Sequence, residues 1–220
     1  IQGLALFEGN EHKLVNRIAH HDDSIYYSLS NSSWESVKVN KDGWQVESNT
    51  PLIFRPYGHQ DAQITPIKGG DAKDIFKFIN IGNEEHKALY LIWQIAAFIP
   101  DIPQPILYLY GPQGSAKSTV SRLIKRIIDP SQIDVSEIPK DQKELIQQLS
   151  HHRCLMFDNV SFLHHSLSDL LCRAVTGLSF SKRQLYSDDS DIIYRLKRCI
   201  GINGINLLAV NPDLLERSIL

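Results

Sequence analysis

Nine consecutive residues carry the clearest chemical signal in the sequence. Residues 111–119 read GPQGSAKST and fit the phosphate-binding pattern G-x-x-x-x-G-K-[ST] at every position but one. Gly111 and Gly114 permit backbone angles that other residues avoid, so successive N–H groups can point at phosphate oxygens. In such a loop Lys117 contacts the β- and γ-phosphates, and the Ser118 hydroxyl binds Mg²⁺. We therefore predict a site for ATP and Mg²⁺ made by Gly111, Pro112, Gln113, Gly114, Ser115, Ala116, Lys117, Ser118 and Thr119.

The segments on either side of this loop support the prediction. Residues 105–110 are apolar and rich in residues that favour strands, and residues 118–128 have apolar side chains at helical spacing. A chance lysine in a turn of small residues is the alternative, but the order of strand, loop and helix disfavours it. The one departure is Ala116, where the general pattern has glycine. Its methyl group is tolerable if this residue already has nearly helical backbone angles.

A second motif lies about forty residues farther along the chain. Residues 154–157 are apolar and lead to Asp158, which is typical of a buried parallel strand that delivers a carboxylate to the ligand-binding edge of a sheet. Asp158 is the expected Mg²⁺ partner, directly or through water, and a capping aspartate is the alternative. The next residue is Asn159, where ATPases of this layout often have a glutamate. Asparagine can orient an attacking water molecule but cannot accept its proton.

Two further polar residues are candidates for the same site. Residues 198–203 predict another buried strand that would bring Asn203 beside Asp158, within reach of the γ-phosphate or the attacking water, although Asn-Gly is also simply a turn sequence. A short helix is predicted at residues 214–217. Arg217 at its end is either a solvated charge or an arginine finger that reaches the γ-phosphate bound by a neighbouring subunit.

The elements that position these residues follow from the apolar patterns. Residues 132–138 predict a further strand and residues 141–150 a helix, a spacing that suits folds in which another strand separates the lysine strand from the aspartate strand. Residues 71–78 and 84–98 predict helices, and the second is apolar on most faces and so is expected to be buried. We predict an ATPase domain over residues 71–220, shortened at its C-terminus.

Residues 1–70 predict a small β-rich module. A short helix is expected at residues 11–20, followed by strands at 24–29, 34–39, 44–47 and 52–55. The turn KDG at residues 41–43 predicts a hairpin between two of these strands. The chain starts without methionine and ends in a sequence typical of a strand, so we expect it to be a piece of a longer protein.

A second hairpin is predicted after a helix at residues 166–175. Its arms, residues 180–186 and 192–197, flank an acidic turn at residues 187–191. The basic side chains on the arms could follow the phosphate backbone of a nucleic acid, or could pair with acidic groups across the strands. These basic residues are Lys182, Arg183, Arg195 and Lys197.

Composition restricts the class of protein. Its 220 residues and net charge of −2 are those of an ordinary soluble globule, and no apolar run approaches the ~18 residues of a membrane span. Three cysteines without metal-binding spacing indicate a reduced, cytoplasmic protein. The three His-His doublets are expected to be structural or solvated, since adjacent residues point apart on helices and strands and no metal-binding partner lies at ligand spacing.

Several segments, taken in order, resemble one family. GPQGSAKST, LMFDNVS, SDLLCRAVTGLSFSKRQLYSDD, GINGI and PDLLERSIL resemble the ATPase domain of bacterial, phage and plasmid replication proteins. These are primase-associated, helicase-like ATPases close to superfamily 3 helicases within the AAA+ class. The resemblance runs from about residue 70 to the end, and an alanine in the phosphate-binding loop is usual in this narrower group. The upstream segment, with GW at residues 43–44 and FR at 54–55, is similar to the segment that precedes the ATPase in the same proteins.

The resemblance implies a P-loop NTPase fold of the α/β class, with a parallel sheet flanked by helices. It also implies a ring, usually a hexamer, that moves on single-stranded or forked DNA in replication of a mobile element, with a primase domain possible in the same full-length protein. By position, Asn203 matches the sensor asparagine and Arg217 matches the finger that acts in trans. The basic hairpin matches the DNA-contacting region, although its acidic turn departs from the usual basic tip.

Two alternatives remain open from the sequence. A monomeric P-loop phosphotransferase would need an arginine-rich lid, which the hairpin after Asp158 fits poorly. A nucleotide-gated DNA-binding module that assembles and turns over little ATP is consistent with Asn159.

Overall fold

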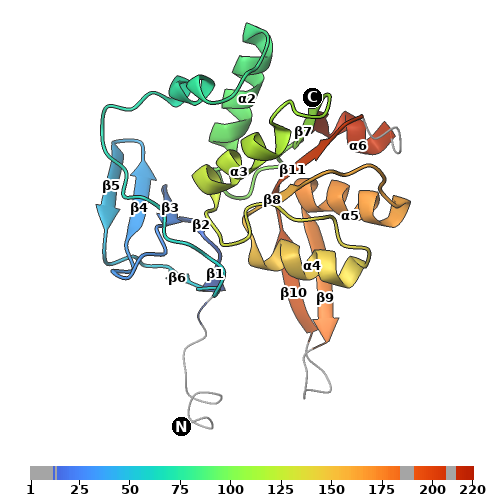
Figure 1. Ribbon diagram of the computed structural model, residues 1–220. Helices are drawn as coiled ribbons and strands as arrows, with labels where there is room; N and C mark the ends of the chain where they lie inside the picture. The colour runs from blue at the N-terminus through green and yellow to red at the C-terminus, as the bar shows by residue number, and fades with distance from the viewer. Residues whose placement is uncertain (1–11, 13, 184–190, 207–211) are drawn as a thin grey trace.

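A four-stranded parallel sheet lies at the centre of the molecule, with a small antiparallel β module beside it (Figure 1). The computed structural model describes residue 12 and residues 14–183, 191–206 and 212–220. The strand order of the parallel sheet is β12, β7, β11, β8. These strands are β7 (Ile106–Tyr110), β8 (Cys154–Phe157), β11 (Cys199–Gly204) and β12 (Ser218–Ile219).

Strand β11 separates the strand that precedes the 111–119 loop from the strand that precedes Asp158. Asn203 of β11 lies opposite Leu109 of β7, and Ile202 lies opposite Phe157 of β8. Because the strands are parallel, their C-terminal ends meet at one edge of the sheet. The predicted strands at residues 105–110, 154–157 and 198–203 are confirmed. The expectation that another strand separates the lysine strand from the aspartate strand is also confirmed, and residues 198–203 supply that strand.

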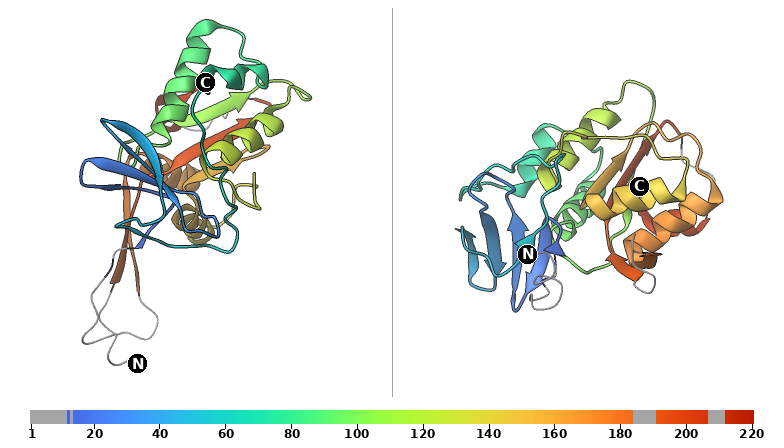
Figure 2. Two further views of the ribbon diagram at one scale, coloured as in Figure 1. Left: turned by 90° about the vertical axis from the view of Figure 1, so that its left-hand side faces the viewer. Right: turned by 90° about the horizontal axis from the view of Figure 1, so that it is seen from below.

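Helices cover both faces of this sheet (Figure 2). Alternate residues of β7 point to opposite faces, so Ile106 and Tyr108 join one apolar core and Leu107 joins the other. The first core includes α4 (Gln142–His151), α5 (His165–Thr176) and α6 (Pro212–Glu216), and the second includes η1 (Ala72–Lys77), α2 (Glu84–Ala96) and α3 (Lys117–Ile128). Among the described residues, none of the helices has the length and apolar content that crossing a membrane requires.

Two predictions near this sheet are wrong: the strand at residues 132–138 and the burial of the helix at residues 84–98 on most of its faces. Residues 132–138 form no strand beyond a single bridge between Ser136 and Phe157, because this polar segment between two prolines runs along β8 for only that one pair. Helix α2 is not buried on most faces. Its buried residues are Tyr90 and Trp93, whereas Ile92 and Ile95 are 63% and 57% exposed. Tyr90 and Trp93 join the core between the helix and the central sheet, whereas the side that carries Ile92 and Ile95 is exposed.

The β module is an antiparallel sheet of β2 (Ile18–His21), β3 (Ser24–Ser28), β4 (Ser36–Asn40) and β5 (Gly43–Glu47), in that order. The hairpin predicted from the KDG sequence at residues 41–43 is confirmed, and because Asn40 pairs with Gly43 its turn consists of residues 41–42. A separate parallel pair joins β1 (Leu14–Val15) to β6 (Ile53–Phe54). The helix predicted at residues 11–20 is wrong over its described part, because these residues pair with β3 and β6 instead.

Strands β9 (Leu178–Arg183) and β10 (Asp191–Leu196) form the predicted second hairpin, which projects away from the parallel sheet in both figures. Most of the predicted acidic turn at residues 187–191 lies outside the described residues.

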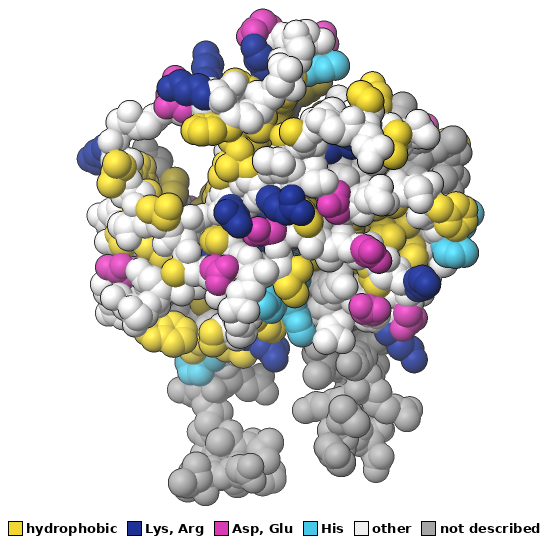
Figure 3. Space-filling view, viewed as in Figure 1, with side chains coloured by type: hydrophobic (Ala, Val, Ile, Leu, Met, Phe, Trp, Pro, Cys, Tyr) yellow, Lys and Arg dark blue, Asp and Glu magenta, His cyan; other side chains and the backbone are white. Residues whose placement is uncertain are grey.

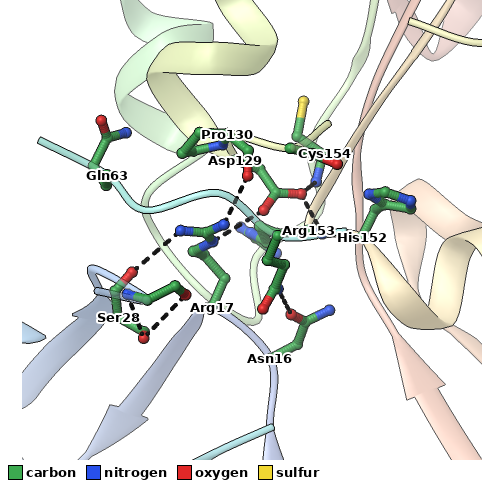
Figure 4. A network of polar contacts seen from close by, with 12 residues as sticks. Asn16, Arg17, Ser28, Gln63, Asp129, Pro130, His152, Arg153 and Cys154 are labelled. Carbon is green, nitrogen blue, oxygen red and sulfur yellow. Dashed lines mark hydrogen bonds and ion pairs between the residues drawn. The ribbon is translucent and has the colours of Figure 1, made fainter. Parts of the chain in front are cut away.

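A buried carboxylate, that of Asp129, joins the β module to the parallel sheet (Figure 4). The Asp129 carboxylate follows the end of α3 and accepts hydrogen bonds from Arg17 Nε at 3.0 Å and Lys125 Nζ at 2.8 Å. It also accepts from the backbone N–H groups of Arg153 and Cys154, at 2.9 and 3.1 Å, at the start of β8. One side chain therefore fixes the module, helix α3 and the central sheet together.

The charges around Asp129 set its protonation state. Burial alone would raise the pKa of this carboxyl, but Lys125, Arg17 and the hydrogen bonds outweigh burial and hold the pKa well below its usual range. Arg17 donates further bonds to the carbonyl oxygens of Pro130 and Asp61, at 2.9 and 3.2 Å. Both cations and the carboxylate are 1% exposed or less, so each depends on the others for its solvation.

Substituting Asp129 with asparagine should destabilise the protein strongly. The variant leaves Arg17 and Lys125 buried without a counter-charge, and we expect the free energy of unfolding to fall by about 3–5 kcal/mol. Urea unfolding followed by tryptophan fluorescence measures this change. Glu84→Gln, which breaks an exposed ion pair with Lys87, is the control and should cost less than about 1 kcal/mol. Equal effects of the two substitutions would contradict the structural role of Asp129.

His152 should make the protein sensitive to acid. Burial and the nearby charge of Lys125 lower the pKa of His152 to about 3, whereas unfolded histidine titrates near 6.5. Between these values the unfolded chain takes up a proton that the native state does not. The free energy of unfolding should therefore fall as the pH drops below about 6.5, by up to about 1.4 kcal/mol per pH unit. His152→Gln should flatten this slope, whereas His165→Gln, at a side chain that is 79% exposed, should leave it unchanged.

Candidate functional site

The 111–119 loop connects β7 to α3 and closes around the amine of Lys117. Lys117 Nζ donates to the carbonyl oxygens of Gly111 and Pro112, both at 2.8 Å, and to Ser115 Oγ at 3.1 Å. The backbone turns sharply because Gly111 and Gly114 have φ values of 153° and 81°. The loop thus carries a cationic centre at the N-terminus of a helix, where unpaired N–H groups favour anions.

Ala116 is the last residue before α3 and has a left-handed conformation, with φ 60° and ψ 17°. The nearly helical angles that would make the methyl group tolerable are therefore present only in left-handed form. The general pattern has glycine here because glycine adopts this conformation without a steric cost, whereas alanine pays about 1–2 kcal/mol. The loop keeps this turn despite the methyl group.

Ser118 and Asp158 meet at the C-terminal edge of the sheet. Ser118 Oγ, in the first turn of α3, donates to Asp158 Oδ1 at 2.8 Å. The two residues are 40 positions apart, and the parallel pairing of β7, β11 and β8 brings them together. A hydroxyl and a carboxylate are oxygen ligands of the kind that Mg²⁺ prefers.

Asn203 lies behind this pair and is buried, with 1% exposure. Its Oδ1 accepts from the N–H of Asn159 at 2.9 Å, and its Nδ2 donates to Ser121 Oγ at 2.9 Å. Its backbone oxygen accepts from the N–H of Val160, also at 2.9 Å. Asn203 therefore holds the turn after β8 against α3, and Asn159 keeps a left-handed φ of 53° within this turn.

A cavity of ≈ 400 Å³ opens beside Lys117, between the loop and the segment that joins η1 to α2. On the loop side it is lined by Gly111, Pro112 and Ser115. Apolar and aromatic side chains form much of the remaining wall. The residues on that side are Ile79, Asn80, Ile81, Gly82, His86, Tyr90, Leu107, Tyr108, Leu109, Tyr110, Val120, Ile219 and Leu220.

The structure does not bring Arg217 to this edge. The Arg217 carbonyl accepts from the N–H of Ile106 at 2.8 Å, so Arg217 lies beside the start of β7, at the end opposite the loop. Its guanidinium forms an ion pair with Asp213, one turn earlier in the chain. Arg217 is thus placed away from the Lys117 of its own chain.

The predicted basic residues lie on the second hairpin. Lys182 and Arg183 are on β9 and Arg195 is on β10, and the side chains at these three positions are outside the described part of the structure. Lys197 follows β10, and its amine donates to the carbonyl of Asp101.

Sequence reasoning missed two contributors to the site. Ser121 was not distinguishable from other helix serines, although its place one turn after Lys117 is a weak signal. The cavity wall at residues 79–82 carries no motif, and only the fold brings it beside the loop. The cysteines Cys154, Cys172 and Cys199 are buried and free, and the described residues contain no cluster that could hold a metal ion by His, Cys, Asp and Glu side chains.

Similarity to known proteins extends over most of the chain. A family model described as actinomycete integrative conjugative element replication protein matches residues 72–220, more than half of the chain. Among solved structures, the chain is similar to the A-form apo structure of the C-terminal region of NrS-1, with 13% identity and a TM-score of 0.41. That match covers 79% of this chain and 51% of the other, so this chain spans about half its length. No curated protein matches.

Ala116→Gly should stabilise the protein. Glycine removes the steric cost of the left-handed turn, and we expect the free energy of unfolding to rise by about 1 kcal/mol. Ala88→Gly, at an exposed position inside α2, is the matched control and should lower it by about 0.5–1 kcal/mol. Thermal or urea unfolding measures both. A decrease of similar size in both variants would show that Ala116 is not left-handed in solution.

Proposed function

The chain belongs to the family of actinomycete integrative conjugative element replication proteins, and from this premise we propose that it is a DNA-dependent ATPase. In this proposal residues 111–119 bind the phosphates of ATP, and hydrolysis to ADP and phosphate drives unwinding or remodelling of DNA during replication of a mobile element. In this proposal the active form is a ring of subunits, a hexamer, in which the adjacent subunit completes each ATP site.

The contact between Ser118 and Asp158 carries the proposal. A hydroxyl at the start of a helix and a carboxylate at the end of a strand lie 2.8 Å apart, next to an amine that the loop encloses. Mg²⁺ bound to an ATP phosphate would take Ser118 and Asp158 as a direct or water-mediated pair of ligands. Lys117 would then exchange its bonds to the Gly111 and Pro112 carbonyls for phosphate oxygens.

The cavity beside the loop suits the remainder of the nucleotide. Its volume of ≈ 400 Å³ is within the range of small-molecule sites, and apolar side chains such as Ile79, Ile81 and Val120 can enclose a base. Because Gly111, Ser115 and Lys117 line the same cavity, a base placed there would have its phosphates in the loop.

Asn203 acts on the attacking water indirectly in this proposal. Its two side-chain groups bond to Asn159 and Ser121, so it positions Asn159 at the end of β8. Asn159 would orient the water by hydrogen bonds, since its amide cannot take the proton. Catalysis of phosphoryl transfer depends mainly on such positioning and on charge stabilisation.

The place of Arg217 supports completion of the site in trans. Within its own chain it lies at the opposite end of β7 from Lys117. Its ion pair with Asp213 is partly exposed, and surface pairs of this kind contribute little, so the guanidinium can exchange this partner for a phosphate. A neighbouring subunit would present it to the γ-phosphate, where an arginine finger contributes about 10³–10⁵ in rate.

The test is the ATPase rate per subunit as a function of protein concentration, with and without single-stranded DNA. The rate of the native chain should rise with concentration and with DNA. Arg217→Ala should lose at least about 10³-fold in rate and retain ATP binding, because the arginine acts on another subunit's nucleotide. Mixing Arg217→Ala with Lys117→Ala should restore part of the activity, since mixed rings contain some intact interfaces.

Binding of a fluorescent ATP analogue provides the control. Lys117→Ala should weaken binding at least tenfold, whereas Lys140→Ala, at an exposed position that belongs neither to the loop nor to the cavity beside it, should not change it. A rate that is independent of concentration, DNA and Arg217 would replace the proposal with a monomeric phosphotransferase. Tight binding with negligible turnover in every condition would replace it with a nucleotide-gated binding module.

A further inference from the structure

A second cavity, of ≈ 250 Å³, lies in the β module and has no part in the proposed ATP site. It opens between the loop that joins β3 to β4 and the segment that follows β6. The residues that line it are Arg17, Ser28, Ser30, Asn31, Ser32, Trp34, Phe54, Arg55, Pro56, Tyr57 and Gln60. Figure 3 shows hydrophobic side chains at the surface of the module on the face that it displays.

The loop on one side of this cavity is held in a strained conformation. Ser30 and Trp34 both have left-handed backbone angles, with φ values of 50° and 56°. For a bulky residue such as tryptophan this conformation is a genuine outlier, and such strain persists where the surrounding structure imposes it. Trp34 is nevertheless 63% exposed, so the energy gained by burying its ring does not offset the cost of this backbone conformation.

Hydrogen bonds fix this loop in place. Asn31 Oδ1 accepts from the N–H of Glu35 at 3.0 Å, and Asn31 Nδ2 donates to Glu35 Oε2 at 2.7 Å. The N–H of Trp34 donates to the Asn31 carbonyl at 3.1 Å, and the N–H of Leu29 donates to the Glu35 carbonyl at 2.9 Å. The indole of Trp34 is therefore carried on a rigid loop.

The opposite side of the cavity supplies a cation and two more rings. The guanidinium of Arg55 lies 5.2 Å from the centre of the Tyr57 ring, and Arg55 is exposed. Phe54 and Tyr57 are half-buried and flank it in sequence. Arg17, whose charge Asp129 balances, also lines the cavity. Of the described residues that line the cavity, none is acidic.

We propose that this cavity binds an unpaired base of single-stranded DNA, with Trp34 as the stacking platform and Arg55 as the contact to the adjacent phosphate. Aromatic faces combined with an arginine are the recurring means of binding single strands without sequence preference. The hydroxyl group of Ser32 can bond to the edge of the base, whereas the amides of Asn31 and Gln60 hold the two walls of the cavity by their bonds to Glu35 and Asn16. The cavity is smaller than the roughly 300 Å³ of the smallest drug-sized sites, and this size suits one base.

The choice of DNA as the polymer rests on the proposed function, whereas the chemistry of the cavity points to a base and a phosphate. A duplex keeps its bases stacked and paired, so it offers no free base to the Trp34 ring. The site therefore discriminates single strands from duplexes. It lies on the module, at a distance in sequence from the predicted basic hairpin, and provides a second DNA contact.

The test measures the dissociation constant of fluorescent oligo(dT) by anisotropy for the full chain and its variants. Trp34→Asn removes the indole and introduces a residue that tolerates the left-handed backbone, so the loop can keep its shape. Loss of one stacked base should weaken binding roughly 5- to 100-fold. Arg55→Ala should weaken it and reduce its dependence on salt. Trp34→Phe, which keeps an aromatic face, should retain most of the affinity.

Two matched controls isolate the cavity. Trp44→Phe and Lys41→Ala change an aromatic and a basic residue of the same module that do not line it, and neither should alter binding. Circular dichroism and urea unfolding confirm that each variant is folded. Equal affinity of folded Trp34→Asn and the native chain would overturn the proposal, as would equal affinity of the native chain for duplex and single strand.

The same experiment with Lys117→Ala separates this inference from the proposed ATPase. Without nucleotide, Lys117→Ala should bind oligo(dT) as the native chain does, because the cavity shares no residue with the 111–119 loop. If Trp34→Asn loses DNA binding while no ATP hydrolysis is found, the proposed base-binding site at Trp34 (the base site) is supported and the ATPase proposal is refuted. If ATP is hydrolysed but the substitutions at Trp34 and Arg55 do not change binding of the single strand, only the base site is refuted.

Discussion

The structure depends on the placement of one negative charge, the carboxylate of Asp129, in its interior. Two buried cations, Arg17 from the β module and Lys125 from α3, would each be costly to bury without it. The backbone N–H groups at the start of β8 complete its hydrogen bonds. Removal of any one of these charges would leave the others buried without a partner, which is costly. The module, the helix and the sheet therefore form a cooperative unit.

Helix α3 extends this constraint to the candidate site. Its last turn carries Lys125, and its first turn carries Lys117 and Ser118, with Ser121 bonded to Asn203 in between. Twelve residues of α-helix span about 18 Å and bend little over that length. The positions of Lys117 and Ser118 relative to β8 are thus fixed at both ends, by the Asp129 contacts and by the pair between Ser118 and Asp158.

The sequence predicted the parts of the fold that obey local rules. The strand before the loop, helix α3, the strand before Asp158 and the hairpin turn at residues 41–42 follow from apolar periodicity and turn chemistry. The predictions that were wrong failed because contacts between distant parts of the chain decide the structure there. Residues 14–20 pair with strands far along the chain, and an exposed apolar face on α2 cannot be distinguished from a buried one by its pattern. The cavity beside Trp34 depends on two loops that only the fold brings together.

The two candidate sites are joined by a stiff connection, and this limits how they can work together. The base site shares Arg17 with the Asp129 cluster, and the candidate ATP site begins at the other end of α3. For one site to move relative to the other, an element between them must have two stable arrangements. Helix α3 is not such an element, because buried charges hold one of its ends and the Ser118–Asp158 hydrogen bond holds the other. Both sites of one chain would therefore move as a single body. In the proposed ring, movement of DNA by ATP hydrolysis would then have to arise between chains, at the proposed contact between Arg217 of one subunit and the loop of the next. The partly exposed ion pair between Arg217 and Asp213, unlike the buried cluster at Asp129, can be broken at low cost, so it is the natural place for that movement to begin.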